Sequence, residues 1–174
     1  MHSAVPAEQE WERFEADLAS CLRVLEEDEY LIISSKLANH YVQFAAQGQF
    51  GMRMEAACDT YILPPEACLT TEDYATMHKL GWNGATMPPP ELLSGPPPAD
   101  GSPNFFVDAS FPVDCAAAAA LAVKTLRLVY GIRHPGLLEY KAFARGGNSI
   151  RFPTLRIKRR SRQVEEEIGE GSEG

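Results

Sequence analysis

Residues 40–58 read His-Tyr-Val-Gln-Phe-Ala-Ala-Gln-Gly-Gln-Phe-Gly-Met-Arg-Met-Glu-Ala-Ala-Cys. Apolar and polar side chains alternate on both sides of a segment that contains Gly48 and Gly51. This alternation predicts two antiparallel strands joined by a turn of five residues, and a turn of that length leaves the register of pairing open. The two faces of this hairpin are Val42, Phe44, Ala46, Met52, Met54, Ala56 and Cys58 on one side, and Tyr41, Gln43, Ala45, Arg53, Glu55 and Ala57 on the other.

Helices are predicted to cover one face of this hairpin. Residues 7–28 place apolar side chains at steps of three and four residues behind Pro6, and the opposite side of this helix is acidic. Residues 70–81 begin with threonines that can cap a helix, and residues 115–130 follow the capping residue Asp114. We interpret the acidic side of the first helix as a solvated face, with a partner-binding surface as the alternative.

The remaining strands are shorter. Residues 30–34, Tyr-Leu-Ile-Ile-Ser, form a continuous apolar run that is typical of a strand buried on both faces. Residues 140–144 and 149–152 flank a Gly-Gly-Asn turn and predict a second hairpin. The last strand of the first meander is expected to end near residues 61–63, before a pair of prolines. Together these elements predict an α+β fold, an antiparallel sheet of about five strands packed against two to three helices.

The length of 174 residues corresponds to a single domain. We predict a disordered N-terminus at residues 1–6, one α+β domain at residues 7–158, and a charged disordered tail at residues 159–174. Residues 87–102 contain six prolines and predict an extended loop within the domain.

Composition and spacing argue against several classes of protein. The net charge of −8 disfavours a general affinity for nucleic acid or anionic lipid. No apolar run approaches the roughly 18 residues of a membrane span, and the first residues lack the pattern of a secretory signal. We therefore expect a cytoplasmic protein. No metal-binding spacing links its cysteines, so we expect buried thiols and no metal or cofactor. The cysteines are Cys21, Cys58, Cys68 and Cys115.

Short catalytic motifs are missing from the sequence. The histidines, His2, His40, His78 and His134, fall in different predicted elements, so no catalytic pairing can be argued. There is no nucleophile elbow, no phosphate-binding glycine loop and no dinucleotide fingerprint. We therefore predict a non-enzymatic protein, with an enzyme that uses no short motif as a remaining alternative.

Several short segments together resemble the TY-Chap domains, bacterial proteins grouped with type III secretion chaperones and the YbjN family. The segments are residues 41–45, 55–56, 61–64, 80–82, 103–105, 126–135 and 142–153. The resemblance implies an α-β-β-β-α-β-β-α fold, often dimeric in the secretion chaperones, that binds extended segments of other proteins. It carries over no catalytic residue, and the proline-rich loop departs from a compact chaperone.

The leading functional hypothesis is a chaperone or adaptor that holds an extended protein or peptide client on a face or an edge of its sheet. The predicted peptide-binding residues are Tyr41, Gln43, Arg53 and Glu55, on the face opposite Val42, Phe44 and Met54. If the other face is the open one, the methionines take that role. The alternative is a structural subunit of a larger bacterial assembly that docks through the acidic first helix or the charged tail. A homodimer is left open, and no nucleic acid or membrane partner is expected.

Overall fold

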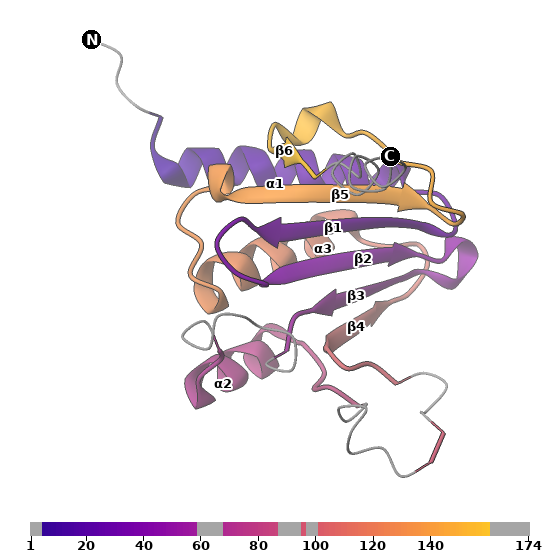
Figure 1. Ribbon diagram of the computed structural model, residues 1–174, viewed down its shortest axis with the longest axis horizontal. Helices are drawn as coiled ribbons and strands as arrows, with labels where there is room; N and C mark the ends of the chain where they lie inside the picture. The colour runs from indigo at the N-terminus through magenta and orange to yellow at the C-terminus, as the bar shows by residue number, and fades with distance from the viewer. Residues whose placement is uncertain (1–4, 59–67, 87–94, 97–100, 161–174) are drawn as a thin grey trace, which may run out of the picture.

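A computed structural model describes residues 5–58, 68–86, 95–96 and 101–160. Within these residues the chain forms a six-stranded sheet in the order β4-β3-β2-β1-β5-β6 (Figure 1). The strands are β1 (Glu29–Ser35), β2 (Tyr41–Ala46), β3 (Met52–Ala56), β4 (Phe105–Ala109), β5 (Leu138–Ala144) and β6 (Lys158–Arg159). The helices are α1 (Ala7–Val24), α2 (Thr71–Leu80) and α3 (Cys115–Lys124), which continues as a π-helical turn at Thr125–Val129. All strand pairs are antiparallel except β5 with β6.

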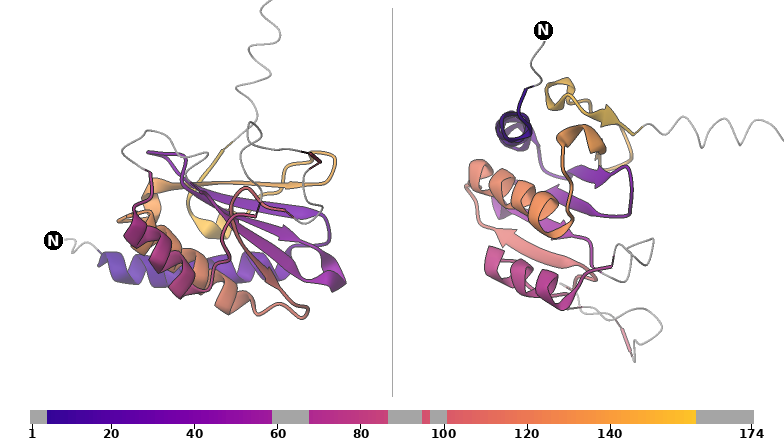
Figure 2. Two further views of the ribbon diagram at one scale, coloured as in Figure 1. Left: turned by 90° about the horizontal axis from the view of Figure 1, so that it is seen from below. Right: turned by 90° about the vertical axis from the view of Figure 1, so that its left-hand side faces the viewer.

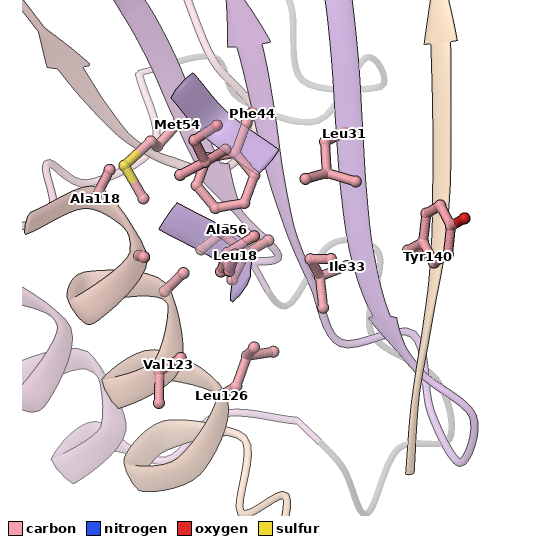
Figure 3. Close-up of a cluster of buried hydrophobic side chains, with 14 of the residues drawn as sticks. Leu18, Leu31, Ile33, Phe44, Met54, Ala56, Ala118, Val123, Leu126 and Tyr140 are labelled. Atoms are coloured by element: carbon pink, nitrogen blue, oxygen red, sulfur yellow. The ribbon is translucent and has the colours of Figure 1, made fainter. Parts of the chain in front are cut away.

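The helices lie on one side of the sheet (Figure 2, right). Period-2 alternation sends one set of strand side chains towards α1 and α3, and these side chains form the core with Leu18, Val123 and Leu126 (Figure 3). Phe44 lies opposite both Leu31 and Met54 in the sheet, and all three are at most 1% exposed. The prediction that one face of the first hairpin is apolar and inward is therefore confirmed.

Small residues of α3 and hydrogen bonds from two tryptophan indoles hold the helical layer in place. Ala118, Ala119 and Ala122 of α3 are buried, which allows its backbone to approach the sheet and α1 closely. The indole of Trp82, which follows α2, donates a 2.9 Å hydrogen bond to the Thr125 hydroxyl in the π-helical turn. The indole of Trp11 in α1 donates to the Arg133 carbonyl oxygen at 3.2 Å. Each tryptophan thus buries its ring and still satisfies its N–H group.

Three predicted elements and one predicted burial differ from the structure. The first helix ends at Val24 rather than at residue 28, and the chain then turns through Asp28, which has a φ of 62°. Strand β3 ends at Ala56, whereas its end was expected near residues 61–63, which lie outside the described residues. The second hairpin is reduced to a single bridge between Phe143 and Ser149. Cys68 is exposed, although all four thiols were expected to be buried.

Strand β4 was missed in the sequence and changes the order of elements. Residues 105–109 pair with β3 along their whole length. Together with β6, and without a strand at residues 149–152, this gives a sheet of six strands instead of about five. After α2 the described chain runs strand, helix, strand, strand, which differs from the strand, strand, helix order that the resemblance implied. The reason is that β4 is a short edge strand whose pairing depends on a partner far away in the sequence. The predicted termini at 1–6 and 159–174 and the loop at 87–102 lie mainly outside the described residues and stay predictions.

Candidate functional site

The face of the sheet that points away from the helices is partly exposed. Figure 1 looks directly onto it, with α1 and α3 behind the strands. Its side chains alternate with the buried ones and mix aromatic, aliphatic, polar and charged groups. We call this surface the open face, and it comprises Tyr30, Ile32, Ser34, Tyr41, Gln43, Ala45, Arg53, Glu55, Phe106, Asp108, Glu139, Lys141 and Phe143.

All four residues predicted to bind a peptide lie on the open face. Gln43 and Glu55 are direct cross-strand neighbours, Arg53 lies opposite Ala45, and Tyr41 lies opposite Ser34 of β1. The sequence pattern therefore placed these residues on one surface correctly, and whether they bind a peptide stays a prediction.

Three of these four side chains make contacts within the chain. The Arg53 guanidinium donates to both carboxylate oxygens of Asp108, at 2.8 and 3.0 Å, and lies 4.8 Å from the centre of the Phe106 ring. These hydrogen bonds hold the pKa of the Asp108 carboxyl below its ordinary value. The Tyr41 hydroxyl donates to the Asn104 side-chain oxygen at 3.1 Å, so each residue also stabilises neighbouring structure.

Glu55 belongs to a polar network that sequence reasoning missed. Its carboxylate accepts a hydrogen bond from the Ser102 hydroxyl. The same hydroxyl accepts a hydrogen bond from the backbone N–H of Asn104 at 3.1 Å. The Ser102 amide donates to the Thr86 hydroxyl at 2.9 Å. Ser102 and Asn104 are buried, so the segment that precedes β4 covers one corner of the open face. No local pattern signals this network, because its partners are far apart in the sequence.

A cavity of about 730 Å³ lies on another part of the open face. Tyr41 and Gln43 contribute to it, whereas Arg53 and Glu55 do not. Residues that the sequence did not single out complete it: Ile32, Ser34, Ser35, Lys36, Leu37, Ala38, Asn39, Glu139 and Arg160. The cavity therefore spans β2, β1 and β5 beside the turn that joins β1 to β2.

The turn beside the cavity is held by backbone contacts. The Ser35 amide donates to the His40 carbonyl oxygen at 2.9 Å, and the Lys36 amide donates to the Leu137 carbonyl oxygen at 2.9 Å. The Ser35 hydroxyl accepts from the Leu37 amide at 3.0 Å. The buried His40 ring stacks on Tyr130 with 4.6 Å between ring centres. These contacts give the cavity a preformed wall.

The alternative in which methionines line the open face is wrong. Met52 and Met54 are 3% and 1% exposed and point into the core beneath α1 and α3. Their strand positions place them on the face that the helices cover. The thioether groups therefore pack the interior, as aliphatic side chains would.

The edges of the sheet are largely covered within the described residues. Asn83 exchanges two backbone hydrogen bonds with Phe106 on the outer side of β4, at 2.9 and 3.1 Å. On the outer side of β5 the amide of Ile150 donates to the Ala142 carbonyl oxygen at 2.9 Å, and the two-residue β6 follows. An added strand would find few unpaired backbone groups, so these edges are poor sites for strand addition.

No group of three or more histidine, cysteine or acidic side chains that could hold a metal ion occurs in the described part of the chain. Among its helices, none has both the length and the apolar composition needed to cross a membrane. Burial raises the pKa of the Cys21 and Cys115 thiols, which disfavours the nucleophilic thiolate at both positions.

Comparison with protein-family models matches residues 5–144 to the family described as TY-Chap3, T3SS (YopN, CesT) and YbjN peptide-binding chaperone 3. Searches of curated proteins and of solved structures each give no match to the chain. The matched region contains α1, α2, α3 and strands β1 to β5, and therefore most of the open face.

Proposed function

This chain belongs to the TY-Chap3 family of peptide-binding chaperones, and on that premise we propose that it holds an extended client segment on the open face of its sheet. The observation that carries the proposal is the asymmetry of the sheet, with α1 and α3 packed on one face and a partly exposed face opposite them. A preformed cavity of about 730 Å³ on that face lies within the size range of ordinary ligand pockets.

Binding on the face fits the sheet better than binding at an edge. Strand addition requires a row of unpaired backbone groups, and both edges are short or covered in the described residues. The open face instead offers side chains suited to adaptable contact. The Tyr30 and Phe143 rings stack with 5.1 Å between centres, and aromatic rings supply a large contact area at a small entropic cost.

The four predicted residues divide into two roles in this proposal. Tyr41 and Gln43 line the cavity and contact the client directly. Arg53 and Glu55 lie outside it on the same face, and their bonds to Asp108 and Ser102 keep that part of the surface in place. The client contact therefore extends from β2 across β1 towards β5.

The test uses the full chain and a fluorescently labelled, permanently unfolded model protein with blocked thiols, with affinity measured by anisotropy. The double variant Ile32→Thr with Gln43→Thr removes contact area from the cavity and keeps residues that suit a strand. We expect about tenfold weaker binding, since a few central side chains dominate such contacts. The matched control, Val24→Thr with Leu128→Thr, removes exposed apolar side chains of 63% and 65% exposure from the helical side.

Equal losses in the two double variants would contradict binding on the open face, as would a failure of the native chain to bind the unfolded probe. Thermal unfolding of both variants shows whether either has lost its fold. If the chain is instead a subunit of a larger assembly, it should bind a single partner in a fixed ratio and should not bind the unfolded probe.

A further inference from the structure

Basic side chains gather where the open face meets β5 and β6. The register pairs Lys158 with Glu139, so these two side chains share the open face. Lys36 and Arg160 both line the cavity, and Lys141 follows Glu139 on the same face of β5. Among the described residues in this area, four cations therefore share the surface with one carboxylate, that of Glu139. The chain as a whole has a net charge of −8, so this positive area is a local exception.

Glu139 neutralises only part of this charge. The Arg160 guanidinium lies 3.9 Å from the Glu139 carboxylate, and the Arg160 side chain is 67% exposed. The Lys36 ammonium donates to the Gly136 carbonyl oxygen at 3.0 Å, a neutral acceptor that leaves its charge available. Both cations thus lie at the rim of the cavity, where they can attract an anion.

The cavity also has an apolar part. Ile32 lies among its lining residues, and Leu37 at the turn is 73% exposed, more than any other large apolar side chain in the described chain. An exposed leucine beside a cavity offers apolar surface that a ligand can cover on binding. The hydrogen bonds of the turn hold the backbone of this leucine in position before a ligand arrives.

We propose that this cavity selects client segments in which a large aliphatic residue is flanked by acidic residues. The inference rests on the proposed function and adds the chemistry of the client to it. The aliphatic side chain packs against Ile32 and Leu37, and the flanking carboxylates lie near Lys36 and Arg160. Charge complementarity supplies selectivity and a faster encounter, while the apolar anchor supplies most of the affinity.

The experiment uses a fluorescently labelled serine-rich peptide that carries one leucine with two glutamates on each side. Three counterparts replace the glutamates with glutamine, the glutamates with lysine, or the leucine with alanine. We expect the full chain to bind the glutamate–leucine peptide about tenfold more tightly than the glutamine counterpart at low ionic strength. This preference should shrink as salt is added, because the cations are near the surface.

A charge-reversal variant tests whether Lys36 and Arg160 cause the preference. Lys36→Glu with Arg160→Glu should abolish the preference for the glutamate peptide over its glutamine counterpart. Lys79→Glu with Lys124→Glu reverses two exposed charges on the helices and changes the net charge by the same amount. This control should keep the preference.

The outcomes separate this inference from the proposed function. Equal binding of the glutamate and glutamine peptides, lost in the Ile32→Thr/Gln43→Thr variant, would overturn the acidic preference and keep the open face as the client site. Equal loss in both charge-reversal variants would also overturn it. If the uncharged glutamine counterpart binds more tightly when Glu165, Glu166 and Glu167 are changed to glutamine, the chain's own acidic C-terminal residues compete for the cavity, which would overturn its assignment to a client.

Discussion

The ion pair between Arg53 and Asp108 shows how an open-face side chain can serve the fold. It joins the central part of the sheet to edge strand β4, and the guanidinium also covers the Phe106 ring. Because the Asp108 side chain is 57% exposed, solvent screens much of the attraction. The pair therefore makes a small contribution to stability and a larger one to the position of β4.

This pair makes stability depend on pH. The Asp108 pKa is lowered in the folded chain, so the ionised form favours folding, and its contribution is present at neutral pH and lost as the pH falls below about 4. We expect Asp108→Asn to lower the free energy of unfolding by under about 1 kcal/mol at pH 7. The difference from the native chain should shrink as the pH falls from about 4 towards 2. Urea unfolding at both pH values measures it, with Asp17→Asn on α1 as the control, and a difference that grows in acid would contradict the assignment.

The open-face residues of β2 and β3 show how much of the candidate site the sequence could predict. Alternation along β2 and β3 was enough to place Tyr41, Gln43, Arg53 and Glu55 on one surface. It could not distinguish Gln43, which lines the cavity, from Glu55, which bonds to Ser102. That distinction depends on a residue 47 positions away in the chain.

Among the elements, the first hairpin agrees best with its prediction because its signal is local. The turn occupies residues 47–51 and pairs Ala46 with Met52, which settles the register that the sequence left open. The second helix begins with a complete capping box between Thr70 and Asp73. Strand β4 has no such local signal, and it forms by pairing with β3 on one side and Asn83 on the other.

Gly51 at the end of the hairpin turn offers a test at this scale. Its φ is 94°, and a Cβ atom there would lie 2.0 Å from the Ala109 carbonyl oxygen of β4. We expect Gly51→Ala to destabilise the chain by more than about 2 kcal/mol, from backbone strain and the clash together. Gly81→Ala is the control, since Gly81 has a φ of 110° but no atom within 4 Å of such a Cβ. Urea unfolding measures both variants. An equal loss in the free energy of unfolding would show that the close approach of residue 51 to β4 does not contribute to the destabilisation.

Across the whole molecule, stability should fall from the centre of the sheet to its edges. Strand β1 pairs with β2 and β5 along nearly its full length, whereas β6 pairs through only two residues. We therefore expect the amides of β1 and β2 to exchange with deuterium most slowly and those of β4 and β6 much faster. Hydrogen exchange followed by mass spectrometry measures this order. Slow exchange in β6 would mean that this edge is protected by more than its two strand residues.

Local patterns in the chain were sufficient for its helices, its central strands and the division of β2 and β3 into an apolar and a polar face. The reason is that side-chain period and capping chemistry act over a few neighbouring residues. Strand β1 was expected to be buried on both faces, whereas its Tyr30, Ile32 and Ser34 are only partly buried. The order of the strands, the covering of their edges and the cavity beside Leu37 came only from tertiary structure. Each of these brings together segments distant in sequence, such as Arg53 and Asp108 or Ile32 and Arg160, and no short pattern specifies such a meeting.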